Sequence, residues 1–220
     1  MDHHFFTINK NKGGGISMEK ELSTRKLRSM QTRENLLEAG RDIFLAEGFQ
    51  KTTISQIIKK ANTGYGTAYV HFKNKDDIFI ELMEDVMNKF YGIAELSFEP
   101  QTGEEAYQLI EHQVGRFLEM ANEERRMMQV IEEAIRASDD VRLRWQTIRE
   151  RFIERIAQDI TYSQKIGLAR TDVDSHLAAR GWFYANEMYL WDIVRNEHGY
   201  SVKDIAHHLT AMYTGGLYKR

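Results

Sequence analysis

The chain has 220 residues, a formal net charge of −3 and no cysteine, so it is long enough to bury a sizeable core but cannot form a disulfide framework or a thiolate metal site. Its single proline, Pro100, among many Glu, Lys, Leu and Ala residues argues against a turn-rich β-fold. The N-terminus lacks the basic start and long apolar core of a signal peptide, and no later segment approaches a membrane-spanning length. We therefore expect an all-α, cytoplasmic protein without a membrane partner.

Charge is distributed unevenly along the sequence. Residues 1–75 carry 13 Lys and Arg against 7 Asp and Glu, a net charge of +6, whereas residues 76–220 carry 17 against 26, a net charge of −9. A basic N-terminal third can bind a polyanion while the acidic remainder is kept away from it. An ordinary solvated surface could give the same counts, so the asymmetry indicates a nucleic-acid partner only together with a motif.

The first 29 residues are predicted to form a flexible, basic N-terminal arm. Residues 1–17 are polar and contain three successive glycines, so they offer little apolar surface to offset the entropy of ordering. Met18 is an alternative to the first residue as the natural start. The basic run from Arg25 to Arg28 then leads into an amphipathic helix, which Gly48 should end by adopting a left-handed backbone.

A helix-turn-helix pattern follows in the basic third of the chain. Thr53 and Gln56 have the spacing of a capping box, which should open a short helix. The break Asn62-Thr63-Gly64 tolerates a left-handed turn, and a second short helix should then direct Ala68 and Phe72 toward a small core. Two short helices that are joined by such a turn and preceded by a third are typical of DNA-binding proteins.

The segment from Arg33 to Phe79 also resembles the N-terminal signature of the tetracycline-repressor (TetR) family of transcriptional regulators. The matching positions are Gly48, Phe49, Thr52, Thr53, Ile57, Ala61, Gly66, Thr67, Tyr69, Phe72 and Lys75. Departures from the family's usual residues at Asn62, Gly64, Ala68 and His71 leave the preferred DNA sequence open. The resemblance implies a three-helix DNA-binding domain at residues 30–76 and a helical effector-binding and dimerisation domain at residues 77–220.

The second short helix is the predicted recognition helix. It has no Arg, Lys, Asn or Gln between Gly64 and Phe72, so base selection should depend on thymine methyl groups and DNA shape. Lys75 lies in the first turn of the next helix, where a cation beside free N–H groups should hold a phosphate. The candidate DNA contacts are Thr52, Thr53, Tyr65, Gly66, Thr67, Tyr69, Val70, His71 and Lys75. For the two threonines a purely structural role remains an equal alternative.

The remaining helices are predicted from caps and apolar stripes. They should begin at Asn74, Thr102, Ser138, about Asp172 and Ser201, and the last should end near Tyr218. Large, adaptable side chains in this part suggest an apolar ligand cavity, although most of them could be ordinary core. The candidate effector contacts are Phe117, Met120, Trp145, Phe152, Trp182, Asn186, Glu187 and Tyr189. Asn186 and Glu187 are included because they interrupt the most apolar stretch of the chain.

The last two helices are the candidate dimer interface. The helix from about Asp172 has apolar side chains around its whole circumference, and a second copy is the simplest way to cover the face that the chain's own core does not. The family resemblance assigns both helices to a four-helix interface. The candidate interface residues are Leu177, Tyr184, Met188, Trp191, Leu209, Met212 and Tyr213. Completion of an intrachain core is the alternative.

The predicted function is that of a regulator, a repressor by family resemblance, which binds double-stranded operator DNA as a homodimer and is released by a small apolar effector. No cofactor or metal is expected, and His207 and His208 are interpreted as exposed histidines rather than metal ligands. A DNA-binding protein controlled by a protein partner, or by no effector, is the alternative. A helical-bundle enzyme is disfavoured because the sequence has no paired Glu-x-x-His motif, nucleophile elbow or phosphate-binding glycine loop.

Overall fold

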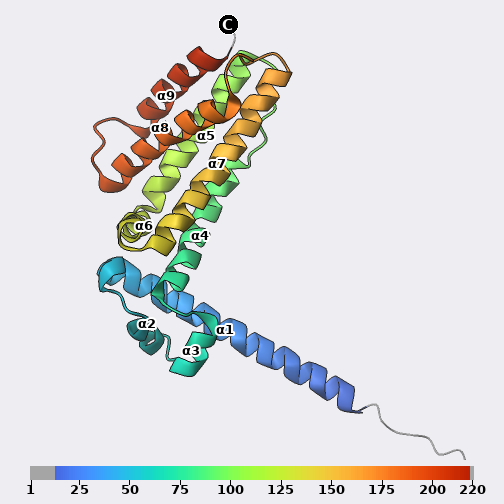
Figure 1. Ribbon diagram of the computed structural model, residues 1–220, viewed down its shortest axis with the longest axis vertical. Coiled ribbons are helices and arrows are strands. Elements are labelled where there is room, and N and C mark those ends of the chain that lie inside the picture. Colours follow the sequence, from blue (N-terminus) through green and yellow to red (C-terminus); the bar gives the residue numbers. More distant parts are fainter. Residues whose placement is uncertain (1–12, 219–220) are drawn as a thin grey trace, which may run out of the picture.

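The computed structural model describes residues 13–218, with side chains from Thr24 onward, and this part of the chain is all-α (Figure 1). Its helices are α1 (Gly13–Lys51), α2 (Ile54–Lys60), α3 (Tyr65–His71), α4 (Lys75–Ala94), α5 (Gly103–Glu123), α6 (Arg125–Ala137), α7 (Asp139–Lys165), α8 (Ser175–Arg195) and α9 (Val202–Leu217). Within the described residues, no helix is both long enough and apolar enough to cross a bilayer.

Helices α1 to α3 form an N-terminal domain, and α5 to α9 form a body that α4 joins to it (Figure 1). The N-terminal domain packs on the start of α4 through three buried rings. Phe44 and Phe49 of α1 each meet Phe79 of α4 edge to face, at centroid distances of 4.9 and 5.0 Å. Because such pairs stabilise a core beyond their buried area, they fix the small domain on α4.

Most of the predicted helix boundaries are confirmed. Thr53 and Gln56 form the capping box of α2, and Asn74 accepts a hydrogen bond from the Asp77 N–H at the start of α4. Asn62 has the left-handed backbone expected of the turn before α3, with a φ of 50°. Helix α3, the predicted recognition helix, follows Gly64, which provides no side-chain cap.

The helices differ from their predicted bounds in two places. Helix α1 begins at Gly13, so residues 13–29 are helical rather than a flexible arm, and residues 1–12 lie outside the described part. The run after the glycines is rich in Glu, Lys, Leu and Met, and a nucleated helix propagates easily through such residues. A second difference is the break at Glu124 between α5 and α6, which neither Gly nor Pro marks.

Helix α6 lies across the end of the body and packs against α1 (Figure 1). Its Glu133 carboxylate accepts hydrogen bonds from the backbone N–H groups of Phe49 and Gln50, at 3.1 and 2.9 Å. Gly48, just before them, has a φ of 80°, and a Cβ there would lie 2.7 Å from a Glu133 oxygen. The glycine is therefore required both for the predicted turn in the chain and for the approach of α6.

Candidate functional site

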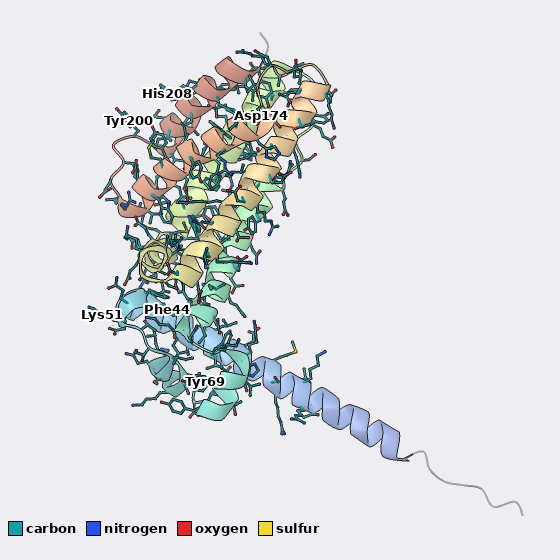
Figure 2. The ribbon with its side chains drawn as sticks, in the orientation of Figure 1. Phe44, Lys51, Tyr69, Asp174, Tyr200 and His208 are labelled. Atoms are coloured by element: carbon teal, nitrogen blue, oxygen red, sulfur yellow. The ribbon has the colours of Figure 1, made fainter. Side chains whose placement is uncertain are left out.

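The recognition helix α3 has one buried and one exposed face, as the sequence predicts. Ala68 and Phe72 are buried, whereas Val70 is 80% exposed and Tyr65 and Tyr69 are about half exposed. Gly66 and Thr67 lie on the same open face, and His71 is half-buried. Tyr69 lies at the end of the molecule remote from α9 (Figure 2). The exposed face is thus free to approach a ligand as large as a DNA groove.

The two threonines at the start of α2 have structural roles. Thr52 is 1% exposed, and its hydroxyl donates to the Gly48 carbonyl at 2.7 Å, so its assignment as a DNA contact is wrong. The Thr53 hydroxyl accepts from the Gln56 backbone N–H at 3.3 Å and donates to the Gln56 side-chain oxygen Oε1 at 2.8 Å. It is therefore occupied by the cap, which is the alternative that the sequence left open.

Lys75 is not a free phosphate clamp, which corrects the sequence-based assignment. Its ammonium donates to the carbonyls of Phe49, Thr52 and Gln50, at 2.6, 3.0 and 3.4 Å, and lies 4.3 Å from the centre of the Phe49 ring. All three N–H groups thus have acceptors at the end of α1, where a helix dipole favours a cation. Lys75 holds the corner between α1 and α2 in place.

Lys73 lies two residues earlier and is exposed. Among the described side chains it has no ion-pair partner, and its backbone N–H donates to the Asp77 carboxylate at 2.9 Å. The sequence did not single out Lys73, because the phosphate contact was predicted from a place in the first turn of a helix, and Lys73 precedes that helix. It is the cation beside α3 that remains available to an anion.

A cavity of about 90 Å³ lies in the body among α4, α5, α7, α8 and α9. Its apolar wall includes Phe117, Phe152 and Trp182, and Asn186 contributes a polar group. These four predicted effector residues are therefore brought together. Met120, Trp145, Glu187 and Tyr189 are not part of the lining, which corrects their assignment to the pocket.

Glu187 is buried for a structural reason. Its carboxylate accepts hydrogen bonds from the Trp145 indole at 2.9 Å and from the Arg149 guanidinium at 2.8 Å. The buried charge is thus paired and hydrogen-bonded within one chain, as a stable buried carboxylate requires. Helix periodicity could not reveal these partners, because they lie 42 and 38 positions away in sequence, on α7.

The cavity also has a polar end that the sequence analysis did not identify. Asp159 and Arg155, one turn apart on α7, form an ion pair there, and Tyr213 and Tyr218 line the same region. Burial raises the pKa of Asp159 to about 6, although the Arg155 charge opposes the shift. Burial also raises the pKa of Tyr218 to about 12 and that of Tyr213 well above its usual value, so both phenols stay neutral.

Residues 36–82 match the family model of bacterial regulatory proteins of the tetR family. This segment includes the end of α1 and all of α2 and α3, whose geometry is that of a helix-turn-helix. Residues 36–82 therefore form a DNA-binding domain of the tetR-family type. Its relatives are transcriptional regulators and not enzymes.

Relatives of the chain match it in the same region. The regulator YhgD of Bacillus subtilis is 33% identical over 72 residues, which are 33% of this chain and 38% of the relative. The regulator QacR of Staphylococcus aureus is 30% identical over 54 residues, 24% of this chain and 29% of the relative. The chain thus spans less than two fifths of the length of either relative.

Solved structures match the chain over most of its length. A putative TetR-family regulator from Syntrophomonas wolfei has a TM-score of 0.67 at 19% identity, covering 84% of this chain and 93% of that one. SmeT, the repressor of the Stenotrophomonas maltophilia efflux pump SmeDEF, has a TM-score of 0.65 at 21% identity, covering 86% and 93%. At these identities the likeness shows the fold.

The predicted interface residues on α8 and α9 fall into two groups. Leu177, Tyr184, Met188 and Met212 are exposed, and Met212 is 77% exposed. The others contact their own chain. Leu209 is 8% exposed, the Tyr213 ring stacks on Trp182 at 4.1 Å, and half-buried Trp191 packs on Trp145 at 5.5 Å. Leu209 is therefore a core residue, which corrects its assignment to the interface, whereas partly buried Tyr213 and Trp191 stay predictions for it.

Proposed function

We propose that this TetR-family protein is a homodimeric transcriptional repressor, which binds operator DNA through α3 and leaves it when a small, mainly apolar effector enters the cavity. The observation that carries the proposal is the open face of α3 within the segment that matches the family model. We also propose that the protein acts in the cytoplasm, because operator DNA is found there.

The DNA-contacting surface consists of α3 and the cations around it. Tyr65, Thr67 and Val70 are exposed and offer a hydroxyl, a methyl group and an apolar surface to base edges. Exposed Lys73 and the basic run from Arg25 to Arg28 supply phosphate contacts, which position the protein but do not select a sequence. Readout then depends on thymine methyl groups and on the shape of the groove.

A second copy of the chain covers the exposed apolar residues of α8 and α9. Leu177, Tyr184 and Met188 recur on α8 at intervals of seven and four residues, so they share one face. Met212 extends this surface onto α9. A two-fold dimer through these helices presents two recognition helices to two half-sites, as helix-turn-helix dimers do.

Helix α4 connects the effector cavity with the DNA-binding face. Ile78 and Phe79 near its start are fully buried in the N-terminal domain, and Ile93 and Ala94 at its end line the cavity. A ligand that binds better when the end of α4 is displaced also displaces α3, which weakens operator binding. The fold neighbour SmeT has been solved in a complex with triclosan, which supports effector binding in this architecture.

The test begins with selection of duplexes from a random DNA library by the purified protein, followed by fluorescence anisotropy on the selected duplex. We expect Val70→Asp to abolish binding, because it brings a negative charge to the groove. Glu38→Asp, an exposed conservative change on α1, serves as the control and should bind like the unmodified protein. Selection of no preferred duplex, or unchanged binding by Val70→Asp, contradicts the proposal.

A further inference from the structure

Asn186 has a hydrogen-bonding capacity that the described part of the chain does not use. The residue is 6% exposed and lines the cavity from α8. Its Nδ2 donates to the Trp182 carbonyl at 2.8 Å, whereas its Oδ1 is buried and has no hydrogen-bond partner among the described residues. A buried carbonyl oxygen without a donor is costly, so this position favours a ligand that supplies one.

The orientation of the Asn186 amide follows from its partner. A carbonyl oxygen only accepts hydrogen bonds, so the atom that faces the Trp182 carbonyl must be the NH₂ group. The atom left over is therefore the acceptor Oδ1. A ligand group at this position must be an O–H or N–H donor, whereas an ether or a ketone would leave two acceptors facing each other.

The rest of the lining favours a ligand without net charge. The one acidic and the one basic side chain of the cavity wall, Asp159 and Arg155, form an ion pair with each other. Tyr213 and Tyr218 are neutral, and Gln113 of α5 adds an uncharged polar side chain to the lining. A charged ligand would have to be desolvated without an unpaired counter-charge to receive it.

We infer that the cavity binds an uncharged, mainly apolar molecule that carries an O–H or N–H donor, and that Asn186 Oδ1 accepts the hydrogen bond from this donor. The inference names the ligand class of the effector site and so rests on the proposed function for its biological meaning. The aromatic rings of Phe117, Phe152 and Trp182 supply the apolar contact. Asn186 Oδ1 favours ligands that carry a hydrogen-bond donor. The site should therefore discriminate between two molecules that differ only in a donor.

The first experiment compares 4-methylphenol with 4-methylanisole by calorimetry on the full chain without DNA. The two probes share a ring and differ by methylation of the hydroxyl, and both are uncharged at pH 7. We expect 4-methylphenol to bind about tenfold more tightly, since one neutral hydrogen bond to a buried acceptor has this order of effect. Equal affinities, or binding of neither probe, would overturn the inference.

Two variants test whether Asn186 is the acceptor. In Asn186→Leu the tenfold preference for 4-methylphenol should disappear, so that both probes bind with about equal affinity. The substitution removes the acceptor and leaves the side-chain volume similar. Ile156→Leu, an apolar change elsewhere in the same lining, should keep the tenfold preference. A preference that persists in Asn186→Leu assigns the hydrogen bond to another residue and overturns the inference.

A measurement on the unmodified chain covers the case in which Asn186→Leu does not fold. The ¹³Cγ resonance of Asn186 should shift on addition of 4-methylphenol and stay in place with 4-methylanisole. The opposite pattern, or a shift with both probes alike, contradicts the assignment. Because these experiments contain no DNA, a phenol that binds as expected but leaves operator binding unchanged supports the inference while it refutes the proposed release mechanism.

Discussion

The N-terminal domain and the body use their polar groups in opposite ways. In the N-terminal domain, Thr52, Thr53 and Lys75 are satisfied by neighbouring backbone or side-chain groups. In the body, three buried side-chain atoms lack a partner among the described residues, namely Arg125 Nε, Asn186 Oδ1 and Thr210 Oγ1. These polar side chains of the N-terminal domain thus have hydrogen-bond partners within the chain, and the proposed DNA contacts lie on its surface. The body, in contrast, has buried polar atoms that could accept or donate a further hydrogen bond.

The largest expected effect separates core from surface on α9. Leu209→Glu places a charge at a buried position and should lower the free energy of unfolding by about 3 to 5 kcal/mol. Met212→Glu, one turn later and largely exposed, should leave the subunit folded and convert the proposed dimer to a monomer. Urea denaturation and light scattering measure the two outcomes. A folded Leu209→Glu dimer would contradict the assignment of Leu209 to the core and of Met212 to the dimer interface.

The next largest effect concerns Asp159 in the body. Because burial raises its pKa in the folded state to about 6, above the unfolded value, the stability it contributes is fully present below pH 3.8 and is lost as the pH rises through 6. The full window corresponds to about 3 kcal/mol. Asp159→Asn should lack this component, so urea denaturation between pH 4 and 7.5 should show a flatter dependence. Parallel curves for the two proteins would refute the raised pKa.

A smaller effect should distinguish the two lysines of the N-terminal domain. Lys75→Met removes three hydrogen bonds to carbonyls and should lower the free energy of unfolding by about 2 kcal/mol. Lys73→Met should leave stability unchanged but weaken DNA binding and reduce the salt slope by about one. Thermal denaturation and anisotropy at several salt concentrations measure both. The reverse result would restore Lys75 as the phosphate contact.

The smallest expected effect lies at the contact between the two regions. Glu133→Gln weakens the hydrogen bonds from Phe49 and Gln50 and should reduce the coupling between effector and DNA by about 1 kcal/mol. Glu132→Gln is the matched control, since this neighbour forms ion pairs with Arg195 and Arg136 and makes no hydrogen bond to the N-terminal domain among the described residues. Operator affinity with and without effector gives the coupling. Equal losses in both variants would exclude a specific role for Glu133.

Sequence reasoning succeeded where a residue's partner lies within a few positions. The capping box of Thr53 and Gln56 and the turn at Asn62 depend on near neighbours, and the exposed face of α3 follows from helical periodicity. It failed where the partner is distant in sequence. Lys75 meets carbonyls about 25 positions away and Glu133 meets N–H groups more than 80 positions away, and no local pattern encodes such contacts.

Helix α4 is a 20-residue rod without a break in its described backbone, from Lys75 to Ala94. At a rise of about 1.5 Å per residue it is about 30 Å long, so a tilt of about 5° at one end displaces the other by roughly 2.5 Å. If α4 pivots about one turn (about 5.4 Å) from Ile93, a displacement of about 0.5 Å at Ile93 by a ligand produces such a tilt. The displacement of the DNA-binding end of α4 then depends on the length of this helix and not on the size of the ligand.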